Sequence, residues 1–336
     1  MTFETLASLV SSVAMPFLAV VLPGAPPAPL AHTYSVVARD PRTGELGVAV
    51  QSHYFSVGPI VPWAESGVGA IATQSLVLVD YGPLGLELLR KGLTARQALD
   101  SLLAADAHRE GRQVAIVDAK GNVAAYTGPS CIPDAGDLQG EQFSVQANLM
   151  ANAKVWPAMK EAFEKTEGDL AERMLRSMEA AEKAGGDIRG RQSAAMVVVK
   201  GTSSGKPWND VVVNLRVEDH AEPLVELRRL LRLRRAYNLV DQGDTYTAQK
   251  QHAEAAKAYD EGAKLAPDVV ELQFWAALTM YTNDRKAESL ALFRKVFSRE
   301  ARWVPLVERL ARVGLFPNDP RAIAEVTAQA RKGAPW

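Results

Sequence analysis

The order of strand-like and helix-like segments constrains the fold of this 336-residue chain more than any other feature. β-Branched and aromatic runs separated by turn residues predict strands at 32–38, 46–52, 67–79, 112–128 (a hairpin), 141–150, 193–200 and 210–217. Helical patterns are also grouped, at 81–106, 152–166 and 169–184. Strict alternation of strand and helix would predict a parallel doubly wound sheet, whereas this grouping predicts sheets packed together and covered by helices. We therefore expect an α+β domain at residues 32–217.

Local signals mark where the predicted helices begin and end. The stretch 81–106 is interrupted at Lys91-Gly92, and Thr94 has the residue type and position of an N-cap for its second half. Gly185 and Gly186 follow the stretch 169–184 and predict its C-terminal end. These signals predict a pair of helices in each group.

The chain is helical in character from 218 to 336, and this part contains a repeat. Seven positions fall at tetratricopeptide spacing: Leu239, Gly243, Tyr246, Ala255, Tyr259, Gly262 and Pro267. A second, degenerate copy runs through 271–297, and 303–326 has the pattern of a final helix pair. Two repeats alone are marginally stable, so we expect a helix near 222–240 to lean on the first domain. The prediction is a second, all-α domain with tetratricopeptide-like repeats.

Residues 1–31 differ from the rest of the chain and predict a leader. The run 6–22 is apolar and uncharged, and no Lys or Arg occurs before Arg39. This apolar length suits the core of a signal peptide and is short for a membrane span, which Pro16 further disfavours. We expect export to the periplasm or the extracellular space and no stable membrane span. An uncleaved anchor and a cytoplasmic location stay open.

Composition excludes several classes of partner and cofactor. The chain carries 38 basic and 39 acidic residues, a formal net charge of −1, so no global attraction to nucleic acid follows. The single cysteine, Cys131, excludes an internal disulfide and a thiolate zinc site. The five histidines show no metal-binding spacing, and the glycines form no phosphate-binding loop. We predict no metal, no cofactor and no nucleic-acid partner.

Residues 33–216 resemble a bacterial family known as domain of unknown function 1028. The resemblance is carried by long strings in order and spacing: "HTYSVVARDPRTGELGVAVQSHYFSVGPIVPWAESGVGAIATQS", "YGPLGLELL", "RQVAIVD", "TGPSCI", "VQANLM" and "GGDIRGRQSAAMVVV". It implies an N-terminal-nucleophile-hydrolase-like fold, in which two antiparallel sheets lie between helical layers (αββα). The family supplies no settled reaction.

The resemblance also singles out Thr33, which corresponds to the nucleophile of the wider superfamily. There the first residue of the processed chain attacks an amide and its own α-amine takes the proton. Here a leader and His32 precede Thr33, so cleavage after Ala31 would leave the Thr33 nitrogen acylated. The hypothesis therefore needs a second cut or self-cleavage between His32 and Thr33. The alternative is that Thr33 is an ordinary strand residue.

Further polar residues cluster where predicted strands begin or end. The segment 187–193 places Asp187, Arg189, Gln192 and Ser193 together before a strand. Two other strands end in Gln51 and Ser52 and in Thr73 and Gln74, and Asn148 ends a third. Their side chains could bind a substrate amide or carboxylate. Structural pairing, and satisfaction of backbone groups at the ends of strands, explain the same residues equally well.

Two functions are consistent with these observations. The first is an amidohydrolase that acts on a small amide or peptide-like substrate through Thr33, with helical repeats that dock a protein partner. The second is a non-catalytic binding or assembly module built on the same fold. Self-association into a homo-oligomer is an expectation by analogy alone.

Overall fold

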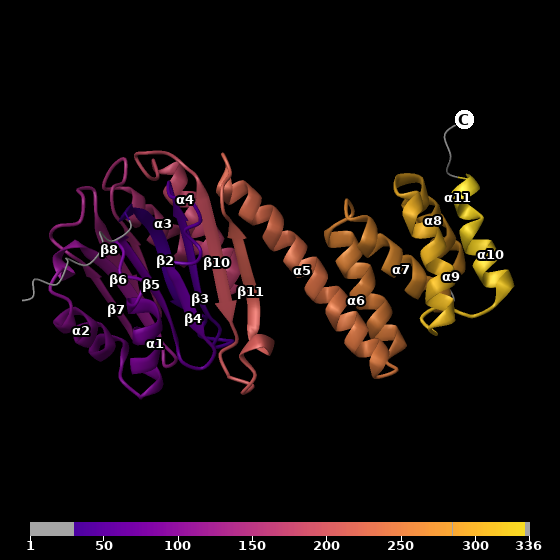
Figure 1. The fold of residues 1–336 in the computed structure, drawn as a ribbon, viewed down its shortest axis with the longest axis horizontal. Helices are drawn as coiled ribbons and strands as arrows, with labels where there is room; N and C mark the ends of the chain where they lie inside the picture. Colours follow the sequence, from indigo (N-terminus) through magenta and orange to yellow (C-terminus); the bar gives the residue numbers. More distant parts are fainter. Residues whose placement is uncertain (1–29, 284, 333–336) are drawn as a thin grey trace, which may run out of the picture.

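Every strand of the described chain, residues 30–283 and 285–332, lies before residue 218, and only helices follow (Figure 1). The structure is a computed structural model. The strands form two antiparallel sheets. The chain is thus a mixed α/β region followed by a helical region, as the grouping of segments in the sequence predicts.

Sheet A has the strand order β1-β5-β6-β7, and β4 pairs with β5. Its strands are β1 (Leu30–Ala31), β4 (Pro62–Glu65), β5 (Gly69–Leu76), β6 (Arg112–Asp118) and β7 (Val123–Thr127). Sheet B has the order β11-β10-β3-β2-β9-β8. Its strands are β2 (Thr33–Arg39), β3 (Leu46–Ser52), β8 (Gly136–Gly140), β9 (Phe143–Ala147), β10 (Ser193–Val199) and β11 (Val211–Val217).

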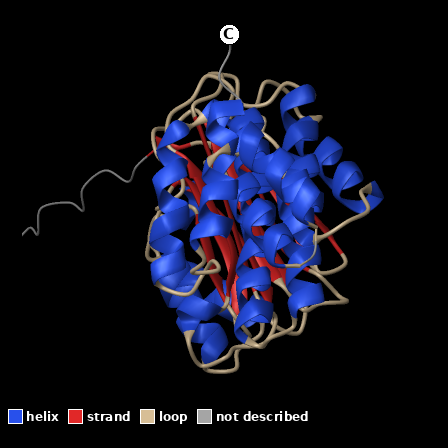
Figure 2. Ribbon diagram, turned by 90° about the vertical axis from the view of Figure 1, so that its right-hand side faces the viewer, coloured by secondary structure: helices blue, strands red, loops and turns tan. Residues whose placement is uncertain are grey.

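The two sheets pack face to face, and helices cover their outer faces (Figure 2). The core between the sheets joins Val37 and Val48 of sheet B to Ala70 and Ala115 of sheet A. Helices α1 (Tyr81–Arg90) and α2 (Ala95–Ala105) pack on sheet A. Helices α3 (Val155–Lys165) and α4 (Leu170–Lys183) pack on sheet B. Because both faces of each sheet are covered, the strands are rich in buried apolar residues.

Two predicted helix boundaries, the start of α2 and the end of α4, are confirmed. Thr94 caps α2: its hydroxyl accepts from the Gln97 backbone, and the Gln97 side chain accepts from the Thr94 backbone. Gly185 and Gly186 follow α4 with φ values of 128° and 59°, in the region that favours glycine. The capping signals in the sequence were therefore sufficient to place these boundaries.

The leader prediction needs a correction at its C-terminal end. We expected residues 1–31 to lie outside the fold, but Leu30 and Ala31 form β1 and pair with Leu76 and Ser75 of β5. Ala31 is fully buried, because its side chain belongs to the core between the sheets. The rest of the leader lies outside the described residues.

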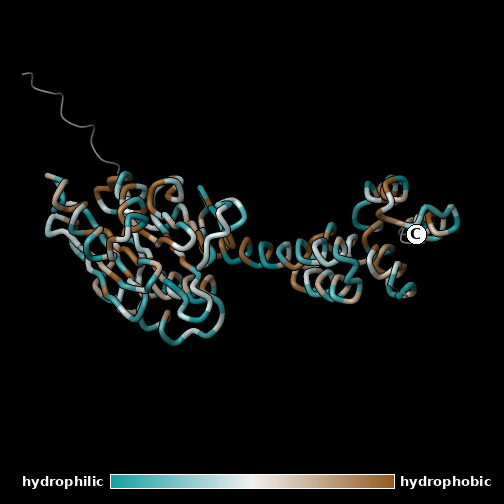
Figure 3. The backbone as a smooth tube through the Cα atoms, turned by 90° about the horizontal axis from the view of Figure 1, so that it is seen from below, coloured by the Kyte–Doolittle hydropathy of each residue, from teal (hydrophilic) through white to brown (hydrophobic). Residues whose placement is uncertain are grey.

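The helical region begins with one long helix, α5 (Pro223–Ala248), which joins the two regions (Figures 1 and 3). Its first half packs Leu224, Leu227 and Leu231 into the core of sheet B, so the helix leans on the first region as predicted. It continues beyond the predicted end at 240 as far as Ala248, and Lys250, two residues further on, has a φ of 60°.

Most of the remaining helices pack against their neighbours along the chain. They are α6 (His252–Leu265), α7 (Val270–Thr282), α8 (Lys286–Arg299), α9 (Val304–Arg312), α10 (Pro320–Thr327) and α11 (Gln329–Lys332). A side chain at Gly243 of α5 would meet the ring of Tyr259 of α6 at 3.0 Å, so this position requires a small residue. No helix within the described residues is long and apolar enough to cross a membrane.

Candidate functional site

Thr33 lies at the start of β2, in the middle of sheet B. The register places Thr33 opposite Ser52 of β3, which in turn lies opposite Ser193 of β10. All three side chains are fully buried. Because Thr33 follows directly after the crossing from β1 in sheet A to β2 in sheet B, both sheets contribute to its surroundings.

Two side chains donate to the carbonyl oxygen of His32, the carbonyl that acylates the Thr33 nitrogen. The Ser52 hydroxyl donates at 2.6 Å and Nη2 of Arg189 donates at 2.7 Å. These lengths are those of donors that stabilise a developing oxyanion. The arrangement can polarise the carbonyl of the His32–Thr33 peptide bond.

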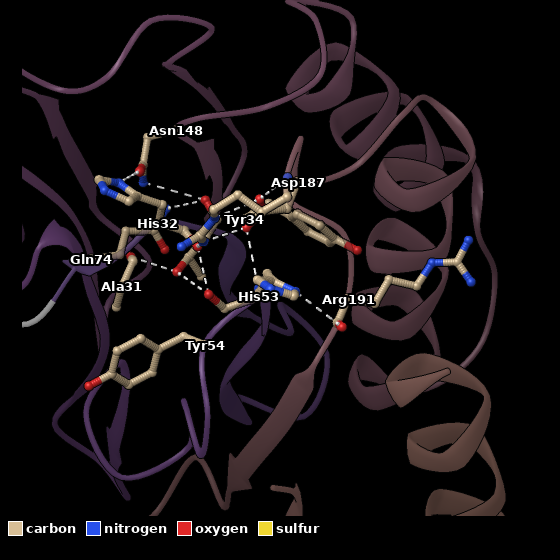
Figure 4. A network of polar contacts seen from close by, with 12 residues as sticks. Ala31, His32, Tyr34, His53, Tyr54, Gln74, Asn148, Asp187 and Arg191 are labelled. Carbon is tan, nitrogen blue, oxygen red and sulfur yellow. Dashed lines mark hydrogen bonds and ion pairs between the residues drawn. The ribbon is translucent and has the colours of Figure 1, made fainter. Parts of the chain in front are cut away.

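Asp187 fixes the guanidinium of Arg189 in this position. Its carboxylate accepts from Nε at 3.0 Å and from Nη2 at 2.7 Å, and from the Arg189 backbone N–H at 2.9 Å. The Asp187 side chain is completely buried, while that of Arg189 is 29% exposed. Asp187 also accepts from the His53 backbone N–H at 3.3 Å, and Figure 4 shows these two residues next to each other. The planar fork of arginine suits this two-point pairing, which lysine would not reproduce.

The Thr33 hydroxyl points back along the chain. It donates to the Ala31 carbonyl oxygen at 2.6 Å, and Oγ of Ser52 lies 3.3 Å away. The hydroxyl is therefore close to the same segment whose carbonyl Ser52 and Arg189 hold.

The imidazole of His32 is buried and lies against Asn148. Its Nδ1 lies 2.8 Å from Oδ1 of Asn148. Figure 4 shows the two side chains facing each other. The Asn148 amide nitrogen donates to Gln113 Oε1 at 2.9 Å, so Asn148 Oδ1 is the acceptor and Nδ1 of His32 carries the hydrogen. Burial foremost, and also the charge of Arg189, lower the pKa of His32 below its ordinary value.

A network of buried amides lies beneath Thr33, between the two sheets. Gln74 of β5 and the Asn148 backbone donate to the Thr33 carbonyl oxygen at 3.2 and 3.1 Å. Gln113 of β6 accepts from Gln74 at 2.7 Å and donates to the Ala147 carbonyl at 2.9 Å. Since these side chains bridge both sheets, they fix the position of the Thr33 backbone.

Backbone strain occurs on both sides of this network. Ser75, directly after Gln74, has a φ of 74°, and Leu149, directly after Asn148, has a φ of 58°. Such values are uncommon for residues other than glycine, and they cluster at functional sites. At Ser75 the positive φ changes the direction of the chain where β5 pairs with β1, and at Leu149 it does so just after β9 ends.

The structure brings some of the sequence candidates together and leaves others apart. Close to Thr33 lie Ser52, Gln74, Asn148, Asp187 and Arg189. The other four are placed elsewhere: Gln51, Thr73, Gln192 and Ser193. Gln51 lies next to Ser52 in β3, and since side chains alternate along a strand it faces the other side of sheet B.

The hydroxyl and amide groups of the other three candidates have structural partners. Thr73 donates to the Leu78 carbonyl at 3.1 Å, and Gln192 donates to Asp219 at 3.3 Å. Ser193 donates to the Tyr54 carbonyl at 2.5 Å and accepts from the Val57 backbone at 3.1 Å. These contacts hold loops that adjoin the strands.

Sequence reasoning missed His32, whose carbonyl is the focus of the site, and Gln113. A signal for Gln113 exists. It is the second residue of the apolar strand 112–118, and because side chains alternate along a strand it shares a face with Ala115 and Val117, which face the core between the sheets. Among the residues described here, no group of three His, Cys, Asp or Glu side chains could hold a metal ion.

The fold and site together define a mixed α/β protein that holds a buried threonine between two packed sheets and carries a helical extension. The model of the family of unknown function DUF1028 matches residues 33–227, more than half of the chain, so the chain belongs to that family. Among solved structures it is similar to protein SPO2555 from Silicibacter pomeroyi, also assigned to DUF1028. The match has 30% identity and a TM-score of 0.54, and covers 60% of this chain and 85% of that one. No curated protein matches the chain.

Proposed function

We propose that this chain is the precursor of an N-terminal-nucleophile amidohydrolase, with an αββα fold of that class, which cleaves its own peptide bond between His32 and Thr33. The observation that carries this proposal is the carbonyl of His32, held by Ser52 and Arg189 directly before the threonine. A peptide carbonyl that accepts from two buried or half-buried side chains is polarised toward attack.

The cleavage begins with attack of Thr33 Oγ1 on the carbonyl carbon of His32, which closes a five-membered ring. The negative charge that develops on the carbonyl oxygen is stabilised by Ser52 and Arg189. The bond from that carbon to the Thr33 nitrogen then breaks, and the proton lost by the hydroxyl ends on the nitrogen. Water hydrolyses the resulting ester, which releases a His32 carboxylate and frees both the hydroxyl and the α-amine of Thr33.

The freed α-amine then serves as the base for the same hydroxyl. Before cleavage, Nη2 of Arg189 lies 2.7 Å from the His32 carbonyl oxygen, and the carbon of that carbonyl is bonded to the Thr33 nitrogen. The guanidinium is therefore close to the amine that cleavage frees. A neighbouring positive charge lowers the pKa of an amine, which favours the neutral, proton-accepting form near neutral pH. Asp187 acts through Arg189 as a positioning residue.

The leader fits this proposal as an export signal whose last residues remain in the fold until self-cleavage. A cut after Ala31 alone would leave His32 on the threonine nitrogen, so activation requires the bond one residue further along. Location outside the cytoplasm and a homo-oligomeric state remain predictions, which fractionation of the native host and analytical ultracentrifugation would test.

The test is the intact mass and N-terminal sequence of the purified full-length chain. We expect a chain that starts at Thr33, and a Thr33→Val variant that stays intact because it lacks the nucleophile at nearly unchanged volume. Thr33→Ser keeps a hydroxyl at the same position and should still cleave. Cleavage in the valine variant, or an intact wild-type chain, would refute the proposal.

A second candidate function is binding by the helical region, and a cleft there favours it. The cleft has a volume of about 970 Å³ and lies between α5, α6, α7 and the segment 314–317. Three carboxylates line it, Asp241, Asp244 and Glu271, and neither lysine nor arginine is among its lining residues in the described part of the chain. We propose that this tetratricopeptide-like region docks a basic peptide segment of a protein partner.

Charge removal tests the docking proposal. Changing Asp241, Asp244 and Glu271 to the matching amides keeps the oxygens that accept from Tyr259 and Tyr237 and removes the charge. At about 0.2–1 kcal/mol for each exposed ion pair, binding of a labelled (Arg-Leu)5 peptide should weaken by about tenfold. The control changes Glu254, Glu261 and Glu288, which lie outside the cleft, to Gln. Equal binding by both triple variants would contradict the proposal.

A further inference from the structure

The chain before Thr33 occupies a strand position on sheet A. Leu30 and Ala31 pair antiparallel with Leu76 and Ser75, at one edge of β5. The opposite edge of β5 is taken by β6, and β4 covers Gly69–Ala72 on the same edge as β1. The segment 30–31 therefore continues the edge of the sheet beyond the end of β4, directly before the bond that we propose is cleaved.

Ala31 and His32, the two residues before the cleaved bond, each have a formed side-chain site. The Ala31 side chain is fully buried in the core between the sheets, in the cluster that contains Val57, Val61 and Val77. His32 is buried, with 3% of its surface exposed, and its ring donates to Asn148 at 2.8 Å. The His32 carbonyl accepts from Ser52 and Arg189. The segment is held as a bound peptide would be, with backbone pairing, two side-chain sites and a polarised carbonyl.

We propose that the substrate of freed Thr33 is a peptide whose acyl side binds as a short antiparallel strand on β5 at Ser75 and Leu76, in the place that residues 30–32 leave. This inference rests on the proposed function and names its substrate class. Addition of a strand to an open sheet edge gives affinity through the backbone and specificity through alternate side-chain sites. Ser75, with its φ of 74°, bends the chain at the position that pairs with the second residue of the acyl side.

The side-chain sites predict the sequence that the enzyme prefers. The site of Ala31 is closed and apolar, so a small residue fits second before the cleaved bond and a larger one does not. The site of His32 offers the Asn148 amide oxygen, so a neutral donor such as imidazole fits first before the bond. The chemical step is the same as in self-cleavage. The threonine oxygen forms an ester with the acyl part, the amine part leaves with the proton, and water then hydrolyses the ester.

The test uses the full-length chain after self-cleavage, freed of residues 1–32 by gel filtration, and a set of fluorogenic probes. The parent probe is acetyl-Pro-Leu-Ala-His-7-amido-4-methylcoumarin, which repeats residues 29–32. One comparison probe has Leu in place of Ala, a second is N-methylated at Leu and Ala, and a third is acetyl-His-7-amido-4-methylcoumarin. The small ester 4-nitrophenyl acetate, which has no strand to pair, reports the nucleophile alone, and the uncleaved Thr33→Val chain gives the background.

We expect kcat/KM for the parent probe to exceed that for each comparison probe by at least about tenfold, the discrimination that one apolar site can give. The peptide acetyl-Pro-Leu-Ala-His with a free carboxylate should inhibit competitively, because its carboxylate meets Arg189. A cleaved chain that hydrolyses 4-nitrophenyl acetate but does not distinguish the four peptide probes overturns the strand inference alone. A chain that never cleaves, or cleaves and hydrolyses nothing above background, overturns the proposed function and the inference with it.

Discussion

Ser52 offers the sharpest test of the proposed self-cleavage. Ser52→Ala removes one of the two donors on the His32 carbonyl oxygen and leaves Arg189 in place. Loss of one such donor reduces the rate of a reaction through an oxyanion by about 10²–10³-fold, which is about 2.7–4 kcal/mol. Ser52 Oγ also lies 3.3 Å from the Thr33 hydroxyl, so its removal affects the nucleophile as well. We expect self-cleavage to slow by at least this factor.

Ser193 provides the matched control. It lies opposite Ser52 in the register of β10 and β3 and is equally buried, but its hydroxyl donates to the Tyr54 carbonyl. Each alanine variant leaves one carbonyl with one donor fewer, that of buried His32 or that of half-buried Tyr54, so each should lose about 1–3 kcal/mol of unfolding free energy. Their stabilities should thus be similar, while Ser193→Ala should cleave at the wild-type rate.

The assay follows the fraction of cleaved chain by intact mass after dilution from urea into native buffer. Stability is measured separately by urea unfolding of each variant in a Thr33→Val background, which prevents cleavage. Equal cleavage rates for the two serine variants would show that contact with the His32 carbonyl is irrelevant, and the reasoning would be refuted.

Three further changes test other parts of the site. Arg189→Lys keeps the positive charge but loses the two-point pairing with Asp187. Self-cleavage should therefore slow by at least about tenfold in the same mass assay, and a wild-type rate would contradict this. The pKa of His32 is lower in the folded chain than its ordinary value of 6.5, so on acidification the unfolded chain binds a proton at a higher pH than the folded chain does. The uncleaved Thr33→Val protein should therefore lose stability as the pH falls below 6.5. Urea midpoints at about pH 7.5 and pH 5 should show this loss, and it should be smaller when His32→Asn is added. Gln113→Met removes the donor to Ala147 and the acceptor for Gln74, so urea unfolding in the Thr33→Val background should show a loss of about 1–3 kcal/mol, whereas an unchanged midpoint would argue against the buried amide network.

The grouping of elements could be predicted from the sequence because it depends on local periodicity and capping. Thr94 and the glycines after α4 mark helix ends through backbone geometry that is set within a few residues. The short strands β4 and β8 were missed, since neither shows an apolar alternation. Strand order within the sheets was not predictable, because it depends on contacts between segments far apart in the chain.

The candidate site was predictable in part. Ser52 and Gln51 are adjacent polar residues, and in the sequence either could be a site residue. Only the strand register, which decides which face of sheet B each side chain lies on, distinguishes them. The part of the site before Thr33 could not be predicted from residue types, because the group at its centre is a backbone carbonyl, that of His32, and every residue has one. Burial of Ala31 also lacked a signal, since a small residue next to prolines is typical of an unstructured leader.

The most direct measurement is the rate at which the purified full-length chain becomes a chain that begins with Thr33. Intact mass and N-terminal sequencing, over time and at several protein concentrations, would give it. Our account predicts first-order cleavage at the His32–Thr33 bond with a rate independent of protein concentration, since nucleophile and carbonyl belong to one molecule. A chain that stays intact, is cut only after Ala31, or is cut at a rate that rises with concentration would contradict it.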